Sequence, residues 1–153
     1  MRKAMDYLPR RAAELVLEAL TDTRVVVVNG ARQVGKSTLA EVVLRQTKVL
    51  GELARQLTWS RVSARLFHYR DRDQYEVDAV LEDNAGQVIA VEVKAAETVR
   101  TDDFRGLRLL KRRLGDRFRA GFVLYCGAQS LAFGDGLTCL PISALWTTSA
   151  SRS

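Results

Sequence analysis

The sequence predicts a mixed α/β fold in which a helix and a short βα fragment precede an α-β-β-β-α-β core. Three patterns support this fold class: four consecutive valines at 25–28, alternating apolar residues between about 65 and 95, and helical spacing of apolar residues between 102 and 114. A continuous apolar run is typical of a buried strand, alternation of a half-buried strand, and a repeat of three to four residues of an amphipathic helix. The chain of 153 residues is long enough for one domain with an appendage.

The predicted elements run in order from an N-terminal helix to a polar tail. Residues 9–20 are expected to form a helix with Pro9 in its first turn, and residues 24–29 a buried strand. A loop at 30–35 leads into a helix at 36–46, and a second helix covers about 49–59. Strands are expected at 65–70, 76–82 and 87–95, followed by a helix from Asp102 to about Leu114 or later, which Thr101 or Asp102 can cap. A strand at 120–126, a short strand at 137–140 and a helical turn at 142–146 complete the core, and the tail at 147–153 is expected to be disordered.

Residues 30–37 match the phosphate-binding pattern G-x-x-x-x-G-K-[ST], the P-loop, at every position. The expected strand before the motif and helix after it are the right context, because backbone N–H groups and the helix N-terminus then surround a phosphate. The predicted nucleotide-binding residues are Gly30, Gly35, Lys36, Ser37 and Thr38. ATP hydrolysis also needs an acidic residue after a second strand, and further parallel strands. Because the sequence shows neither, we expect at most weak binding of ATP, and no hydrolysis.

The stretch from Glu76 to Lys94 predicts a β-hairpin with a three-residue turn at Asn84–Gly86. This turn pairs residue 83 with residue 87, which sets Asp78 opposite Glu92 and Glu76 opposite Lys94. Alternation then divides the hairpin into an apolar face (Val77, Ala79, Leu81, Ile89, Val91, Val93) and a face that carries the charges (Glu76, Asp78, Val80, Glu82, Val88, Ala90, Glu92, Lys94).

The facing carboxylates of Asp78 and Glu92 predict a cation between them, because like charges directly opposite each other repel. Carboxylate oxygens suit Mg²⁺ or Mn²⁺, and Lys94 is placed to orient or deprotonate an attacking water. We therefore predict Asp78, Glu92 and Lys94 as catalytic residues. The alternative is a solvent-facing hairpin with ordinary charges. Glu76 is either a third acidic site residue or the partner of Lys94 in a cross-strand ion pair.

At these residues the chain resembles the PD-(D/E)xK nuclease superfamily, whose signature is an Asp followed on the next strand by Glu-x-Lys. The match consists of Asp78 and Glu92-Val93-Lys94 in an α-β-β-β-α-β order, with Val77 in place of the proline. Many members of the superfamily add a glutamate on the first helix, and Glu52 stands at that place. The resemblance thus implies Glu52, Asp78 and Glu92 as metal ligands, and cleavage of phosphodiesters as the activity.

A wider resemblance covers nearly the whole chain. The residues around Tyr7–Arg10 and Asn29–Ser37 are similar to the start of a group of bacterial and archaeal AAA-type P-loop ATPases that end in a nuclease-like domain of unknown function. Residues 49–146 resemble that C-terminal domain, so the middle of the ATPase is missing. We interpret residues 1–48 as a truncated ATPase fragment, joined to the nuclease-like domain near Thr47 by an internal deletion.

Charge favours nucleic acid as a partner. The net charge is +6, and residues 100–119 contain eight basic and three acidic residues. Arg105, Arg108, Arg112 and Arg119 form a stripe on the expected helix, and we predict that the first three contact phosphates; the alternative is a solvated helix face. His68 is more easily explained as a structural strand residue than as a base.

The remaining predictions concern location and assembly. No apolar run is long enough to span a bilayer, and Cys126 and Cys139 lack the spacing of a metal site, so a cytoplasmic protein without a membrane partner is expected. The strand at 24–29 is expected to add to an exposed sheet edge or to pair with a second copy of the chain, which would give a homo-oligomer. Silent interaction or assembly is the remaining alternative to catalysis.

Overall fold

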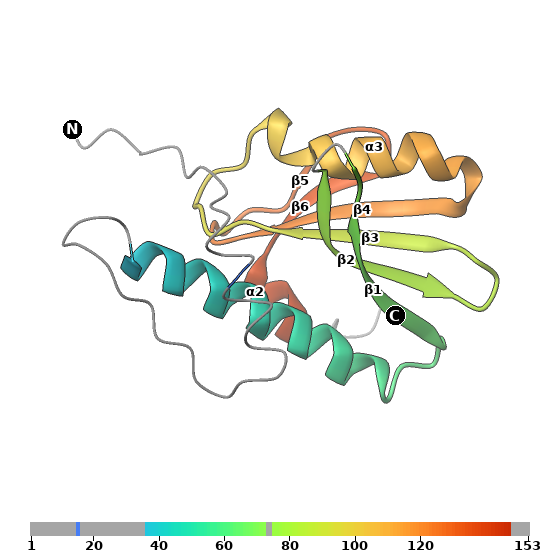
Figure 1. Cartoon of the computed structure of the whole chain (residues 1–153), viewed down its shortest axis with the longest axis horizontal. Helices are drawn as coiled ribbons and strands as arrows, with labels where there is room; N and C mark the ends of the chain where they lie inside the picture. Colours follow the sequence, from blue (N-terminus) through green and yellow to red (C-terminus); the bar gives the residue numbers. More distant parts are fainter. Residues whose placement is uncertain (1–14, 16–35, 73–74, 148–153) are drawn as a thin grey trace, which may run out of the picture. The chain divides into compact units, whose positions relative to one another are not determined.

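The computed structural model describes residue 15, residues 36–72 and residues 75–147 (Figure 1). The chain divides into two compact units, residues 1–47 and 48–153, and the second unit contains the sheet. The helix predicted at 9–20 (except residue 15), the strand at 24–29, the loop at 30–35 and nearly all of the tail lie outside the described residues. The described part is mixed α/β, as predicted, with the element order α2-β1-β2-β3-α3-β4.

Helix α2 spans Lys36–Leu57 without interruption. The prediction of two helices, 36–46 and 49–59, was therefore wrong at its break. No proline or glycine stands between residues 46 and 49, and the hydroxyl of Thr47 donates a hydrogen bond of 2.8 Å to the carbonyl of Val43, one turn back. The helix ends in a turn in which the N–H of Thr58 donates to the carbonyl of Arg55.

Within the described residues, six strands form one mixed sheet in the order β1-β2-β3-β4-β6-β5. Strands β1 (Ala64–Arg70), β2 (Glu76–Asp83) and β3 (Val88–Val93) form an antiparallel meander, and β4 (Phe118–Tyr125) pairs parallel with both β3 and β6 (Leu137–Pro141). Strand β5 (Leu131–Ala132) is exposed and pairs antiparallel with β6. Two residues are too few to show a periodic pattern, so the sequence did not predict β5.

Helix α3 (Arg105–Leu114) lies between two 3₁₀ turns, η1 (Thr101–Phe104) and η2 (Gly115–Arg117). The N-cap of η1 is Arg100 rather than Thr101 or Asp102, because the Asp103 carboxylate accepts a 2.8 Å hydrogen bond from the N–H of Arg100. The helix ends where Gly115 takes a φ of 55°, a region that glycine tolerates. Arg119 therefore lies on β4, not on the helical stripe where it was predicted.

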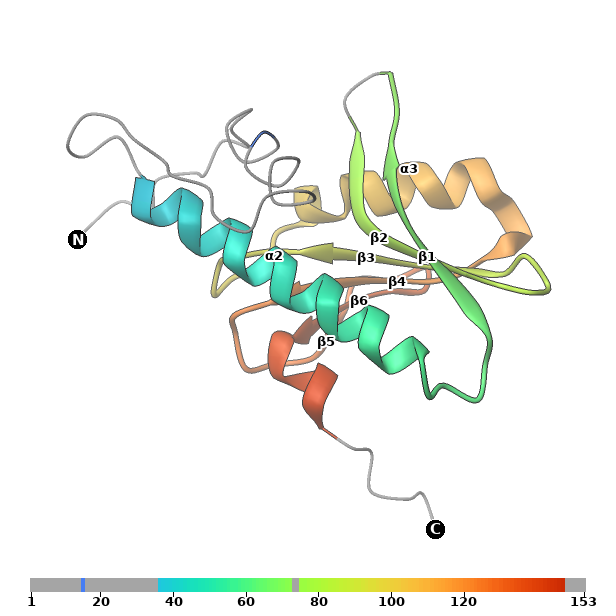
Figure 2. The ribbon, with the colours of Figure 1, turned by 60° about the horizontal axis from the view of Figure 1, so that its bottom comes forward.

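Two apolar clusters place the helices on opposite faces of the sheet. The first lies on the α3 side and joins Val80, Val88 and Ala90 to Phe104, Leu107 and Leu110. The second lies on the α2 side, joining Ala79, Val91 and Val93 to Val49, Leu50 and Leu53, and it also receives Ile142 and Leu145 of the 3₁₀ turn η3 (Ile142–Trp146), which was predicted as a helical turn. Figure 2 shows α2 and α3 on either side of the strands.

The predicted hairpin register is the observed one. Ala79 pairs with Val91 and Leu81 with Ile89, the N–H of Asp83 donates to the carbonyl of Gln87, and Gly86 takes a φ of 75°. The predicted faces hold from Ala79 to Val93, but Val77 packs on the α3 side, and Glu76, which pairs with Arg70, lies on the opposite side. The reason is a β-bulge: two steps along β1, from Phe67 to Tyr69, face three steps along β2, from Val80 to Val77. The alternation of β2 therefore breaks next to Asp78.

Candidate functional site

Asp78 lies in the bulge of β2, and its side chain binds the neighbouring strand. The carboxylate accepts a hydrogen bond of 2.7 Å from the backbone N–H of Val93 on β3. Burial raises the pKa of the Asp78 carboxyl above its usual value, while the N–H of Val93 and the charge of Lys94 act in the opposite direction. Bulges re-aim side chains next to functional sites, and here the bulge holds an acid against β3.

The two carboxyl oxygens of Glu92 have different surroundings. It stands between Val91 and Val93, which pack on the α2 side, so its own side chain points to the α3 side. Its Oε1 lies 3.5 Å from Lys94 Nζ, whereas its Oε2 is buried and lacks a hydrogen-bond partner among the described residues. Burial first, and then the charge of Asp78, raise the pKa of Glu92 to about 8, although Lys94 opposes the shift.

Lys94 joins the two carboxylates to a third acid that the sequence analysis did not select. Its Nζ is 3.5 Å from Glu92 and 3.7 Å from Oδ1 of Asp103. The other oxygen of Asp103 accepts the N–H of Arg100, so the start of η1 fixes the acid that holds the lysine. The sequence did not single out Asp103, because a capping box is recognised by Ser or Thr at the cap, and the cap here is Arg100.

The cluster of Asp78, Glu92 and Lys94 is suited to a divalent cation because one of its buried carboxylate oxygens has no hydrogen-bond donor among the described residues. A buried carboxylate oxygen without a donor is costly, and a cation between Glu92 and Asp78 would satisfy it and relieve the repulsion between the two acids. These two residues would supply the protein oxygens, with water filling the other positions, as Mg²⁺ prefers.

Glu52 is not brought to this pair. It is on α2, across the sheet from Glu92. Its carboxylate forms an ion pair with Arg55, whose Nε donates a hydrogen bond of 2.8 Å, and it accepts another hydrogen bond of 2.8 Å from the Gln56 amide. These hydrogen bonds, from Arg55 first, lower the pKa of Glu52. Within the described ranges no three His, Cys, Asp or Glu side chains gather at metal-binding distance, so the resemblance-based ligand set of three acids does not form here.

Glu76 and His68, the other two residues discussed for the site, make contacts outside the cluster of Asp78, Glu92 and Lys94. Glu76 pairs with Arg70 at 3.0 Å, not with Lys94 as the cross-strand alternative held. Nδ1 of His68 lies 3.4 Å from the carbonyl of Asp78, on the exposed side of β1. This contact places His68 beside the bulge, in agreement with a structural role.

The predicted phosphate-contacting arginines share the outward face of α3. Leu107 and Leu110 of the same helix are buried, and residues 105, 108 and 112 lie on the opposite side of a helix with 3.6 residues per turn. The Arg105 guanidinium lies over Tyr75 at 5.0 Å, and Arg108 donates a 2.7 Å hydrogen bond to the carbonyl of Thr101. Arg112 is exposed. Their contact with nucleic acid stays a prediction.

The predicted nucleotide site falls mostly beyond the described part of the chain. Gly30 and Gly35 lie outside it, and Lys36, Ser37 and Thr38 form the first turn of α2, where only the backbone is described. The prediction of an oligomer through residues 24–29 lies outside it as well. None of the helices in the described ranges combines the length and the apolar character needed to cross a membrane.

Residues 43–145 match the protein-family model described as a domain of unknown function, DUF4143. The matched range includes most of α2, the whole sheet and the cluster of Asp78, Glu92 and Lys94. Among the curated proteins and among the solved structures, no significant match to the chain was found.

Proposed function

Because the chain belongs to the DUF4143 family, whose match extends over the sheet and its acidic cluster, we propose that it is a metal-dependent nuclease-like protein that cleaves phosphodiesters at Asp78, Glu92 and Lys94. The observation that carries this proposal is the buried Oε2 of Glu92, which has no hydrogen-bond partner among the described residues. A structural acid would be expected to have its oxygens paired. An acid whose function is to bind a cation would have an unpaired oxygen while the cation is absent.

Each residue has a distinct part in the proposed reaction. Asp78 and Glu92 hold the cation, and the Val93 N–H keeps the Asp78 carboxylate in place. Lys94 orients the attacking water, and Asp103 is a positioning residue that holds Lys94 at 3.7 Å. When bound, the cation would lower the pKa of that water and neutralise charge on the phosphate.

The proposal is tested by titrating Mn²⁺ into the full chain in a calorimeter and by incubating labelled DNA and RNA with the protein and Mn²⁺. The variant is Asp78→Asn, because an amide oxygen can still accept the Val93 N–H while the charge is lost. The matched control is Asp116→Asn, an exposed acid on η2. We expect Asp78→Asn to lose both heat and cleavage, and the control to keep both. Equal cleavage by wild type and Asp78→Asn would overturn the proposal.

We also propose that residues 1–48 derive from a P-loop ATPase and bind ATP weakly without hydrolysing it. What supports this is the motif itself, together with a helix that includes Lys36, Ser37 and Thr38. Calorimetry with ATP and Mg²⁺ tests it, because any heat from the P-loop should disappear in Lys36→Ala while Mn²⁺ binding at Asp78 persists.

A further inference from the structure

One face of the edge strand β1 carries a line of arginine and aromatic side chains. Tyr69 packs on the α3 side of the sheet and Leu66 on the α2 side, so alternation puts Arg65, Phe67 and Tyr69 on the α3 side. Phe67 pairs with Val80, which also belongs to the α3 side. Helix α3 leaves this part of the sheet uncovered, since Phe67 is 43% exposed.

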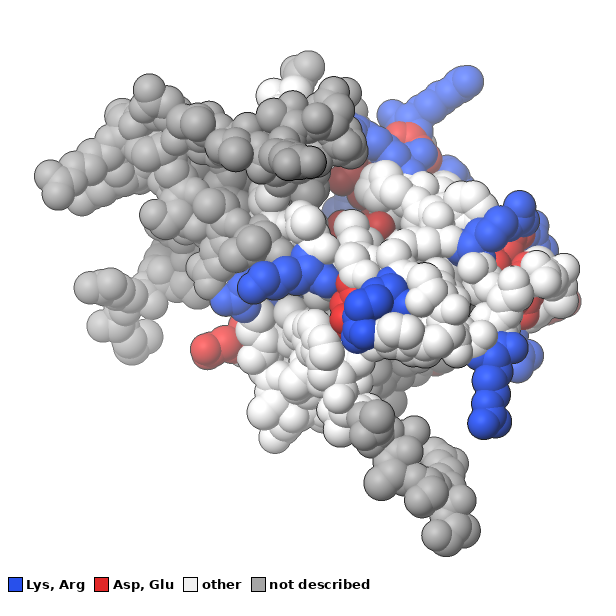
Figure 3. Space-filling model, turned by 90° about the horizontal axis from the view of Figure 1, so that it is seen from below, with Lys and Arg blue, Asp and Glu red and all other residues white. Residues whose placement is uncertain are grey.

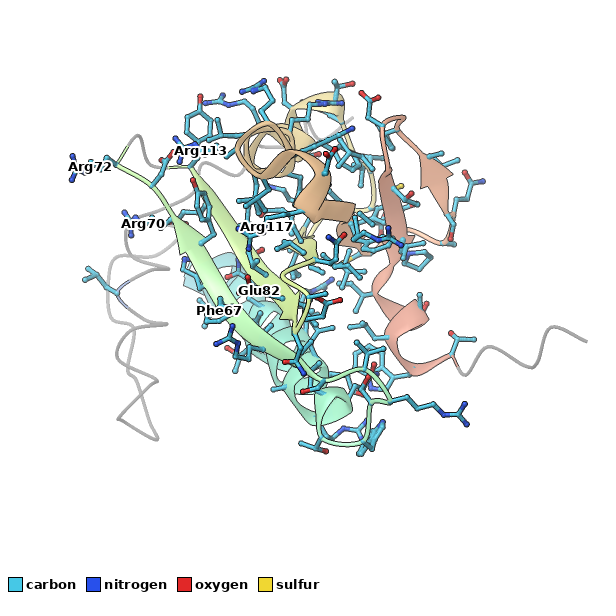
Figure 4. The ribbon with its side chains drawn as sticks, turned by 90° about the vertical axis from the view of Figure 1, so that its right-hand side faces the viewer. Phe67, Arg70, Arg72, Glu82, Arg113 and Arg117 are labelled. Carbon is cyan, nitrogen blue, oxygen red and sulfur yellow. The ribbon has the colours of Figure 1, made fainter. Side chains whose placement is uncertain are left out.

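Two further arginines reach this face from α3 and η2. Arg117 donates to Glu82 at 2.7 Å and to the carbonyl of Gly86 at 2.9 Å. Arg113 pairs with Asp71 at 2.9 Å and also donates to the Tyr69 hydroxyl. Figure 4 shows Arg113 near the end of β1, close to Arg70 and Arg72, with Arg117 and Glu82 further along β2. We call Arg65, Phe67, Tyr69, Arg113 and Arg117 the arginine–aromatic row.

The acids of this region hold the arginines without covering them. Glu82 receives both Arg117 and, at 3.6 Å, Arg65. The Asp71 and Glu82 side chains are 8% and 22% exposed, whereas those of Arg113, Arg117 and Arg65 are 46%, 52% and 71% exposed. A guanidinium has five N–H donors and a carboxylate engages about two of them. The arginines are therefore fixed in position and still present donors to solvent.

Two aromatic rings of the row lie beside its arginines. The Arg65 guanidinium lies 5.5 Å from the centre of the Phe67 ring, and Arg113 lies 5.9 Å from the centre of the Tyr69 ring. Beyond Tyr69 the surface opens into a depression of about 710 Å³ that Arg70, Arg72 and Arg113 help to line. The α2 side is different: Figure 3 shows its Lys and Arg in small separate groups among uncharged residues.

We propose that the arginine–aromatic row binds single-stranded nucleic acid, with Arg65, Arg113 and Arg117 on phosphates and Phe67 under a base. Arginines alone would suit any polyanion, but an exposed ring beside them is what an unpaired base needs for stacking. A duplex offers phosphates but keeps its bases stacked away from such a ring. The row is thus suited to a single strand more than to a duplex or to an acidic peptide.

The position of the row connects it to the candidate site. Phe67 and Tyr69 pair with Val80 and Val77, which are the residues on either side of the bulge that contains Asp78. Neighbouring β-strands are about 5 Å apart. A single-stranded nucleic acid bound along β1 would therefore pass about one β-strand spacing away from Asp78. This inference rests on the proposed function for the statement that the bound strand is a substrate, whereas binding itself does not depend on it.

The test is fluorescence anisotropy of labelled oligonucleotides of about twelve nucleotides with the full chain in EDTA, so that no cation and no cleavage are involved. Single-stranded DNA, single-stranded RNA and duplex DNA are compared at several salt concentrations. The variants are Phe67→Ala and Arg65→Ala, both at exposed positions, and the control is Lys48→Ala, which removes one exposed charge on α2.

We expect Phe67→Ala to weaken single-strand binding about tenfold, in line with the loss of one stacked base. Arg65→Ala should reduce the slope of log affinity against log salt by about 0.7, the value for one phosphate on a single strand. The control should change neither. Equal affinity for duplex and single strand, or unchanged affinity in Phe67→Ala, would overturn the proposal. Comparing DNA with RNA identifies which of the two is bound.

The two proposals fail separately. Binding in EDTA that depends on Phe67, without cleavage in Mn²⁺, would retain the row and overturn the nuclease site. Cleavage that depends on Asp78, with no effect of Phe67→Ala or Arg65→Ala on binding, would retain the site and overturn the row.

Discussion

Replacing Glu92 by Gln should stabilise the protein at alkaline pH. The pKa of Glu92 is raised from 4.5 to about 8 in the folded protein, while the unfolded chain releases this proton near the usual value. Between these values the unfolded state binds fewer protons than the folded state, so the free energy of unfolding falls as the pH rises through the window. Below about pH 4.5 both states hold the proton and nothing is lost.

The size of the effect follows from the width of this window. About 3.5 pH units at 1.36 kcal/mol each gives about 5 kcal/mol, which is a large part of the stability of an ordinary domain. The Glu92 side chain is 17% exposed, and water that reaches the carboxylate reduces this figure. We therefore expect Glu92→Gln to be more stable than wild type by at least about 2 kcal/mol at pH 9, and close to wild type at pH 5.

The assay is urea unfolding followed by circular dichroism at half-unit steps from pH 5 to 9.5, in EDTA. Glu97→Gln removes an exposed acid and serves as the control, which should follow wild type. Replacing EDTA with Mn²⁺ should restore the alkaline stability of wild type but not raise that of Glu92→Gln, because a ligand of the folded state stabilises by mass action. Parallel pH profiles for wild type and Glu92→Gln would refute the reasoning about Glu92.

Three further predictions concern single substitutions. Gly106→Ala should lower the free energy of unfolding by about 2 kcal/mol, since the added Cβ would lie 2.5 Å from the Glu76 carbonyl. The control Gly51→Ala, with open space around its Cβ, should be neutral or stabilising. Both are measured by urea titration, and equal free energies of unfolding for the two variants would contradict the close approach of α3 to the Glu76 backbone. Lys94→Met should abolish cleavage but keep the heat of Mn²⁺ binding, so loss of that heat would assign Lys94 to binding instead. Glu52→Gln should leave Mn²⁺ affinity unchanged in calorimetry, and a tenfold loss would make Glu52 a ligand after all.

The hairpin was predictable because its determinants are local. A turn with glycine at the third position, Gly86, fixes the register, and the register puts Asp78 opposite Glu92. The bulge next to Asp78 was not predictable, because it depends on how β1 pairs with β2 and no residue marks it. Consequently the sequence indicated which residues form the cluster, but not that Val77 changes sides or that Asp78 binds the backbone of β3.

Elsewhere, too, contacts that depend on the folded chain were not visible in the sequence. The break predicted at 46–49 came from interpreting residues 36–46 and 49–59 as two separate helical patterns, although no helix-breaking residue stands between them, and α2 runs through it. Glu52 was assigned by analogy of position on a helix, whereas its side chain is engaged by Arg55 and Gln56. Asp103 was not predicted as a site residue, because its distance from Lys94 depends on how η1 packs against the end of β3.

The topology of the sheet has a kinetic consequence for the acidic cluster. The meander of β1, β2 and β3 pairs residues close in the chain, whereas β4 reaches β3 only after the crossover through α3. Local pairings form faster than distant ones, so the meander is expected to assemble first and to bring Asp78 against Glu92 before α3 closes over them. Alkaline pH should then slow the folding of this protein more than it speeds its unfolding.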